Sequence, residues 1–142
     1  MINLKEGNEL SPFIEKAIKI GKALQPSQNT YHCAFAFRRN RLLAIGLNST
    51  HKPCLKAFKI AKRFKNEHFK KYSYLHAEID VVARLWGREH IDGSMKIVVL
   101  RFNLKGDLMN SKPCKNCAEI LRALNVHKIW WSNENNGISF GI

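Results

Sequence analysis

Four stretches of the chain place apolar residues at the three- and four-residue spacing of an amphipathic helix. The first begins after Ser11 and Pro12, residue types favoured just before a helix and at its first position. The second sets its apolar side chains against a face of lysine and arginine. The predicted helices cover residues 11–24, 53–64, 75–86 and 114–124.

Four shorter apolar runs have the length of strands, and they cover residues 31–37, 42–47, 95–100 and 126–131. The first two are separated by a short polar turn and predict a β-hairpin. The last two are β-branched runs of the kind found in fully buried strands, and a predicted helix lies between them. Strands that alternate with helices indicate an α/β fold, in which helices cover a sheet that contains at least one parallel pair.

The length and composition agree with this fold class. A chain of 142 residues is long enough to bury a sizeable core, so we expect a single domain over residues 1–142. Hydrophobic residues make up 45% of the chain and recur from end to end, which excludes a disordered or fibrous class. The sequence contains no signal peptide and no apolar run that could span a bilayer, so we expect a cytoplasmic protein with no membrane contact.

The chain is strongly basic. Its 24 lysines and arginines outnumber its 11 acidic residues and give a formal net charge of +13. Such a charge attracts phosphates and indicates an anionic substrate or partner. The basic residues are dense in segment 52–71, which suits binding of single-stranded DNA or RNA. A basic surface that serves solubility alone is the other interpretation.

The cysteines and one histidine indicate a metal site. Four cysteines in a chain without a secretion signal are typical of thiols or metal ligands rather than disulfides. Cys114 and Cys117 are three residues apart at the start of a predicted helix, so both thiols lie on one face. Together with the imidazole of His76 they suit tetrahedral Zn²⁺ and leave its fourth position open, as in catalytic zinc sites. We therefore predict that these three residues bind zinc.

Glu78 lies two residues after His76 and is not needed as a ligand. Its predicted role is catalytic, because a carboxylate beside zinc-activated water can accept its proton and pass protons to the substrate. The start of a helix at each motif favours the thiolates and the ionised carboxylate. Taken alone, a Cys-x-x-Cys pair also suits a redox site or a structural zinc site, for which His127 is the nearest further ligand.

The combination of His76-Ala77-Glu78 with Pro113-Cys114-Lys115-Asn116-Cys117 resembles the signature of the cytidine and deoxycytidylate deaminase superfamily. The resemblance extends from about residue 31 to residue 131. It implies a three-layer α/β/α sandwich with a mixed sheet, the cytidine deaminase-like fold. It also implies that Asn48, after the second strand, and the backbone of Ala77 bind the substrate. A plain turn residue is the alternative for Asn48.

The resemblance implies a zinc-dependent hydrolytic deaminase that acts on a cytosine nucleotide, and we expect conversion of dCMP to dUMP by attack of water at C4. An alternative substrate is cytosine or adenine within single-stranded DNA or RNA, bound through the basic surface. A non-catalytic zinc domain that binds nucleic acid is a second alternative, which the presence of Glu78 disfavours. A homo-oligomer is expected, although nothing in the sequence determines the number of copies.

Two pairs of residues in or near the basic segment have candidate roles. Tyr72 and Tyr74 precede the histidine motif, where an aromatic ring could stack on a base, and Tyr74 is included in the predicted substrate site. His51 and Cys54 are three residues apart and would suit a second, structural zinc. We favour a loop there, because the sequence offers no evident set of four ligands.

Overall fold

The computed structural model describes residues 11–24, 30–48, 59–60, 62–64 and 76–141. In chain order the elements are α1 (Pro12–Ala23), β1 (Thr30–Arg38), β2 (Arg41–Leu47), α4 (Ala77–Leu85), β3 (Met95–Asn103), β4 (Leu108–Met109), α5 (Lys115–Ala123), β5 (Lys128–Ser132) and β6 (Ile138–Phe140). The strands form one sheet in the order β2-β1-β3-β5-β6, with β4 beside the end of β3. The β3–β5 pair is parallel and the other pairs are antiparallel, so the sheet is mixed.

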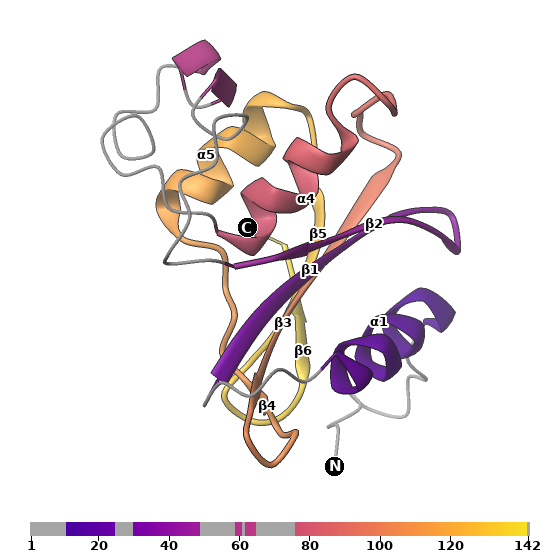
Figure 1. The fold of residues 1–142 in the computed structure, drawn as a ribbon, viewed down its shortest axis with the longest axis vertical. Helices are drawn as coiled ribbons and strands as arrows, with labels where there is room; N and C mark the ends of the chain where they lie inside the picture. The colour runs from indigo at the N-terminus through magenta and orange to yellow at the C-terminus, as the bar shows by residue number, and fades with distance from the viewer. Residues whose placement is uncertain (1–10, 25–29, 49–58, 61, 65–75, 142) are drawn as a thin grey trace.

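Helices cover both faces of this sheet (Figure 1). Successive side chains of a strand point to opposite faces, and β1 follows this rule. Its Phe35 and Phe37 are buried in a cluster with α1, whereas Ala34 and Ala36 are buried in a second cluster with α4 and α5. The small side chains of these alanines allow α4 and α5 to lie close to the sheet. The three layers confirm the sandwich that the resemblance implied.

Most of the predicted elements are present. The hairpin, the helix at 11–24 and the parallel pair are confirmed, with shifts of a few residues at element ends. The sequence reading missed β4 and β6, which are two and three residues long and therefore too short to show a hydrophobic period. In the predicted helix at 53–64, residues 59–60 and 62–63 are helical, residue 64 is in a turn, and residues 53–58 and 61 lie outside the described residues. In the part of the chain that is described, no helix has the length and hydropathy to cross a membrane.

The end of β2 is fastened to the first turns of α4. A Cβ atom built on Gly46 would lie 2.4 Å from the carbonyl oxygen of Ala77 and 2.4 Å from the backbone nitrogen of Val81, so only glycine fits between strand and helix. One residue further on, the backbone N–H of Leu47 donates to the buried carboxylate of Asp80 over 2.8 Å. These contacts hold the start of α4 against the edge of the sheet.

Two buried serines fix the segment that leads into α5. The Ser111 hydroxyl donates to the carbonyl oxygen of Val99 in β3 over 2.7 Å and accepts from the backbone N–H of Ser132 over 3.0 Å. The Ser132 hydroxyl donates to the carbonyl oxygen of Met109 over 2.6 Å. Because buried polar groups without partners are costly, this closed network favours one path for the chain. The start of α5 is thereby held beside the ends of β3 and β5.

Candidate metal centre and active site

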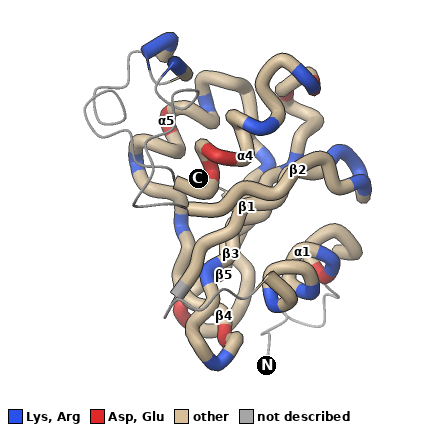
Figure 2. Tube along the Cα trace, in the orientation of Figure 1, with Lys and Arg blue, Asp and Glu red and all other residues tan. Residues whose placement is uncertain are grey.

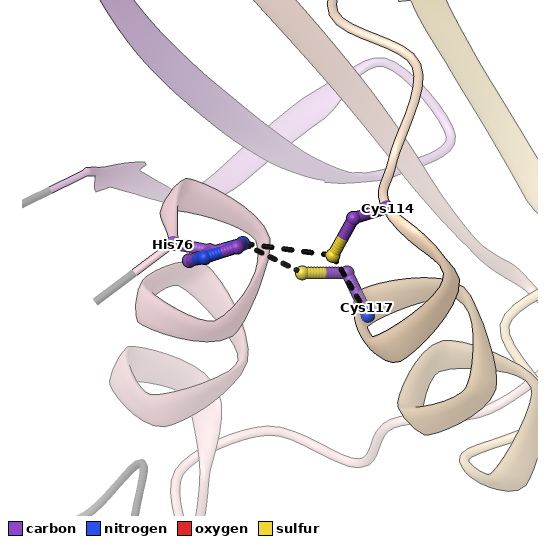
Figure 3. A group of neighbouring side chains, drawn as sticks. All are labelled: His76, Cys114 and Cys117. Carbon is purple, nitrogen blue, oxygen red and sulfur yellow. Dashed lines mark hydrogen bonds between the residues drawn. The ribbon is translucent and has the colours of Figure 1, made fainter. Parts of the chain in front are cut away.

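His76, Cys114 and Cys117 meet where α4 and α5 begin (Figure 3). His76 is the residue that precedes the first turn of α4, and Cys114 occupies the same position in α5. The Nδ1 atom of His76 lies 3.7 Å from the Sγ atom of Cys114 and 3.4 Å from that of Cys117. All three candidate ligand atoms lie within 4.8 Å of one another. The tertiary structure thus brings together the three residues that the sequence predicts as metal ligands.

The spacing of these atoms fits zinc. Zn–S and Zn–N bonds of about 2.3 and 2.0–2.1 Å at a tetrahedral angle place a sulfur and a nitrogen about 3.6 Å apart. The two nitrogen–sulfur separations fall on either side of that value. Two thiols and one imidazole are also the donors that zinc prefers, and the three ligands found in the described part of the chain leave one position for water or substrate. The donor set therefore suits a catalytic zinc better than a closed structural one.

The two thiols have opposite electrostatic environments. Hydrogen bonding from the Cys117 side chain, together with that from His76, lowers the pKa of Cys114 to about 3. The backbone N–H of Cys117 also donates to Cys114 Sγ over 3.4 Å. The pKa of Cys117 is raised well above its ordinary value, first by the hydrogen bond between its side chain and that of Cys114 and then by burial. Without metal, the pair therefore holds one thiolate and one thiol.

Glu78 lies in the first turn of α4 and is 7% exposed. Burial raises the pKa of its carboxyl group, while its own backbone N–H and the charge of His76 act in the opposite direction. Its carboxylate also accepts a hydrogen bond from the Cys117 side chain, which places it directly beside the thiols. A carboxyl group with a raised pKa next to a metal site is a suitable proton carrier near neutral pH.

Asn48 follows β2, the strand that packs on the start of α4. Its side-chain oxygen accepts a hydrogen bond from the backbone N–H of His32 over 3.1 Å, and its own N–H donates to the His32 carbonyl oxygen over 3.4 Å. No described residue accepts a hydrogen bond from its side-chain nitrogen. The Asn48 side chain is therefore held against β1, and its predicted role in substrate binding stays a prediction. Of the other predicted substrate contacts, Ala77 is buried at the start of α4 and Tyr74 lies outside the described residues.

Several residues that shape this region were not identified from the sequence. Gly46, Asp80 and Ser111 fix the starts of α4 and α5. In the sequence, none of the three belongs to a motif that would mark it as a structural contact. The only local signal was the four-residue spacing of Asp80 and Arg84, whose side chains form an ion pair of 3.0 Å. His51, Cys54 and Tyr72 lie outside the described residues, so the second zinc site stays a hypothesis.

Two solved structures resemble this fold. A dCMP deaminase from the cyanophage S-TIM5 is 20% identical, with a TM-score of 0.54 over 88% of this chain and 86% of that one. A cytidine deaminase from Mycobacterium leprae is 18% identical, with a TM-score of 0.48 over 89% and 88% of the two chains. No family model and no curated protein matches the sequence. The likeness to the cyanophage enzyme shows that the chain has the cytidine deaminase-like fold.

Zinc uptake by the metal-free protein should release protons. The pKa values of Cys117 and His76 are raised, and both residues must lose their protons to bind a metal. Protons therefore compete with zinc, and each displaced proton should tighten zinc binding about tenfold per pH unit until the ligands are ionised. Calorimetric titrations at pH 6 and pH 8, in buffers of different ionisation enthalpy, measure both the affinity and the proton count. A zinc affinity independent of pH would contradict the ligand set. Cys33→Ala is the control and should keep binding zinc, because Cys33 is buried in the cluster with α1, on the other face of the sheet.

Proposed function

We propose that this protein is a zinc-dependent deaminase of a cytosine nucleotide, with dCMP as the expected substrate. The observation that carries the proposal is the meeting of His76, Cys114 and Cys117 at two helix starts, with the Glu78 carboxylate hydrogen-bonded beside them. The fold, shared with a cyanophage dCMP deaminase, supports it. A structural zinc site or a redox pair would have no use for a buried carboxylate in that place.

In the proposed reaction water replaces the amino group at C4 of cytosine, and ammonia leaves. Zinc held by the imidazole and two thiolates would supply a Lewis acid that lowers the pKa of a bound water toward neutrality. Glu78 takes a proton from the attacking water and passes it to the ring nitrogen beside C4. It then transfers the second proton to the departing amine, so that it ends the cycle ionised as it began. Its burial favours this role, because a raised pKa makes the carboxyl group both an adequate base and an adequate acid.

The side chain and backbone around this centre suit recognition of a small planar base. The side-chain nitrogen of Asn48 can donate to a sugar hydroxyl or a base carbonyl. Ala77 has a side chain small enough for a ring to approach its backbone. Its position between the candidate metal ligand His76 and Glu78 supports a contact between that backbone and the base.

A substrate panel tests the proposed function. Purified zinc-loaded protein is incubated separately with dCMP, CMP, cytidine, AMP, a single-stranded cytosine oligonucleotide and the corresponding RNA. Each product is then examined for the mass increase of about one dalton that accompanies replacement of an amine by a hydroxyl. We expect deamination of dCMP. If no member of the panel is deaminated by protein with a full complement of zinc, the proposal fails.

Deamination within a polynucleotide is the second candidate, and one surface favours it. Lys59, Lys62 and Arg63 are exposed, and they line a pocket of about 580 Å³ together with Ile60 and Trp86. The Arg63 guanidinium lies 5.6 Å from the centre of the Trp86 ring. Cations beside an aromatic ring are typical of single-strand binding surfaces. Figure 2 shows lysine and arginine on several elements of the described part of the chain, and most of the basic segment 52–71 lies outside it, so the substrate panel decides between the two candidates.

A further inference from the structure

His32 and Arg101 are neighbours on the face of the sheet that α4 and α5 cover. They are cross-strand partners in the β1–β3 ladder. Their chain neighbours Cys33 and Leu100 are fully buried in the cluster with α1. Because side chains alternate along a strand, His32 and Arg101 point to the opposite face, toward the helix starts that carry the candidate metal ligands.

The electrostatics of His32 show that this pair lies near the candidate metal centre. Burial, together with the positive charges of Arg101 and His76, lowers the pKa of His32 to about 4. His32 is therefore neutral at pH 7. Its backbone also holds the Asn48 side chain through the hydrogen bond described above. His32 is thus next to Arg101 on the sheet, is hydrogen-bonded through its backbone to Asn48, and is close enough to His76 to interact with its charge. Arg101 carries a permanent positive charge in this region.

Within the described segments, the charge of the Arg101 guanidinium has no partner. Its side chain is half-buried, and its Nε atom is buried without a hydrogen-bond partner. No described carboxylate forms an ion pair with it. Asp80 on α4 is engaged by Arg84 and by the backbone of Leu47. A buried donor without a partner is costly, and native structures usually satisfy one with a water or a ligand.

The strand backbone holds Arg101 in place on both sides. Its backbone N–H donates to the hydroxyl of Ser132 over 3.1 Å, within the serine network that fixes the approach to Cys114. Met109 of β4 is its partner on the side away from His32. An arginine on a strand that is paired on both sides is a positioned group, and a planar guanidinium matches the oxygens of a phosphate with two parallel hydrogen bonds.

We propose that Arg101 binds a phosphate group of the substrate and makes the site selective for phosphorylated cytosine compounds over the free nucleoside. This inference rests on the proposed function, because it uses the same site. It assigns phosphate recognition to the half-buried Arg101 beside the candidate metal centre rather than to the exposed lysines and arginines. Asn48 and Arg101 then hold the two ends of a nucleotide on one polar surface beside the metal ligands.

Binding measurements test this inference without relying on turnover. Calorimetry measures the affinities for cytidine, dCMP and a short cytosine oligonucleotide in zinc-loaded protein in which Glu78→Gln suppresses turnover. R101Q, R101K and R122Q are each made in this background, and wild type here means the background with Arg101 and Arg122 unchanged. Arg122 is an exposed arginine on α5 and serves as the matched control. We expect wild type and R122Q to prefer dCMP over cytidine, and R101Q to lose roughly 10- to 100-fold of that preference, as for hydrogen bonds to a charged group. R101K should retain part of it, because lysine keeps the charge without the planar fork.

The outcomes separate the inference from the proposed function. Equal affinity of the wild type for dCMP and cytidine, or an unchanged preference in R101Q, overturns the role of Arg101. An Arg101-dependent preference in a protein that deaminates nothing in the panel would refute the deaminase and leave the phosphate site standing. Loss of oligonucleotide binding in R101Q, with dCMP binding weak throughout, would assign the site to a phosphodiester. If R101Q does not fold, as judged by circular dichroism, the R101K and wild-type preferences decide.

Discussion

Glu78→Gln should reduce deamination by about 10²- to 10⁴-fold, the usual contribution of a positioned proton carrier. Glutamine has the same shape and can still form hydrogen bonds, but it cannot take a proton from water. The three candidate metal ligands are untouched, so the variant should keep a full equivalent of zinc. Steady-state kinetics on dCMP and metal analysis of the same preparation measure the two quantities together.

The same variant has a second, independent readout in stability. Burial raises the pKa of Glu78 in the folded metal-free protein, so folding favours its protonated form. Stability is then lost as the pH rises through that raised value, because ionising the buried group becomes a cost of the folded state. Glutamine removes this loss, and metal-free Glu78→Gln should melt at least as high as the wild type at neutral pH. A lower melting temperature would show that the carboxylate supports the fold.

Wild-type activity should fall on the acid side, since the ionised base is lost there. Glu119→Gln is the matched control, because Glu119 is an exposed carboxylate on α5, two residues beyond Cys117. Its kinetics and zinc content should equal those of the wild type. Full activity in Glu78→Gln would rule out the proposed proton transfer. Loss of zinc in that variant would instead assign Glu78 to the structure of the metal centre.

Gly46→Ala should destabilise the protein and weaken its zinc site at once. The added methyl group would lie 2.4 Å from two backbone atoms of α4, a carbonyl oxygen and an amide nitrogen, which cannot rotate away as a side chain would. Overpacking of this kind costs typically 1–3 kcal/mol and sometimes more. Relief requires α4 to move from β2, and His76 moves with the start of that helix. Thermal melts should therefore show a fall of roughly 5–10 °C, by the usual scaling for a domain of this size.

Gly93→Ala provides the control for this effect. A Cβ atom at Gly93 would lie 3.6 Å from the carbonyl oxygen of Asn125, an ordinary contact distance, so the stability should change little. Zinc affinity separates a local from a global effect, because displacement of His76 alone would weaken metal binding even below the melting temperature. Normal melting and normal zinc affinity in Gly46→Ala would show that strand and helix are not packed as closely as described.

The sequence by itself determined the local features of this protein. Hydrophobic periods within single segments predicted α1, the β1–β2 hairpin, α4 and α5, because each period reflects burial of one face of one element. The motifs around His76 and Cys114 were also local, since a few consecutive residues place the candidate ligands and Glu78 at helix starts. That was enough to predict zinc and a deaminase, and the resemblance supplied the three-layer fold.

The tertiary structure alone decided how these pieces meet. His76 and Cys114 are 38 residues apart in the sequence. Their approach depends on Gly46 in β2 and on two buried serines, Ser111 before α5 and Ser132 at the end of β5. The neighbouring positions of His32 and Arg101 depend on strand register, which pairs residues of β1 and β3 that no local pattern connects. Contacts between distant segments arise from packing and pairing across the whole domain, so a period read within one segment carries no signal of them.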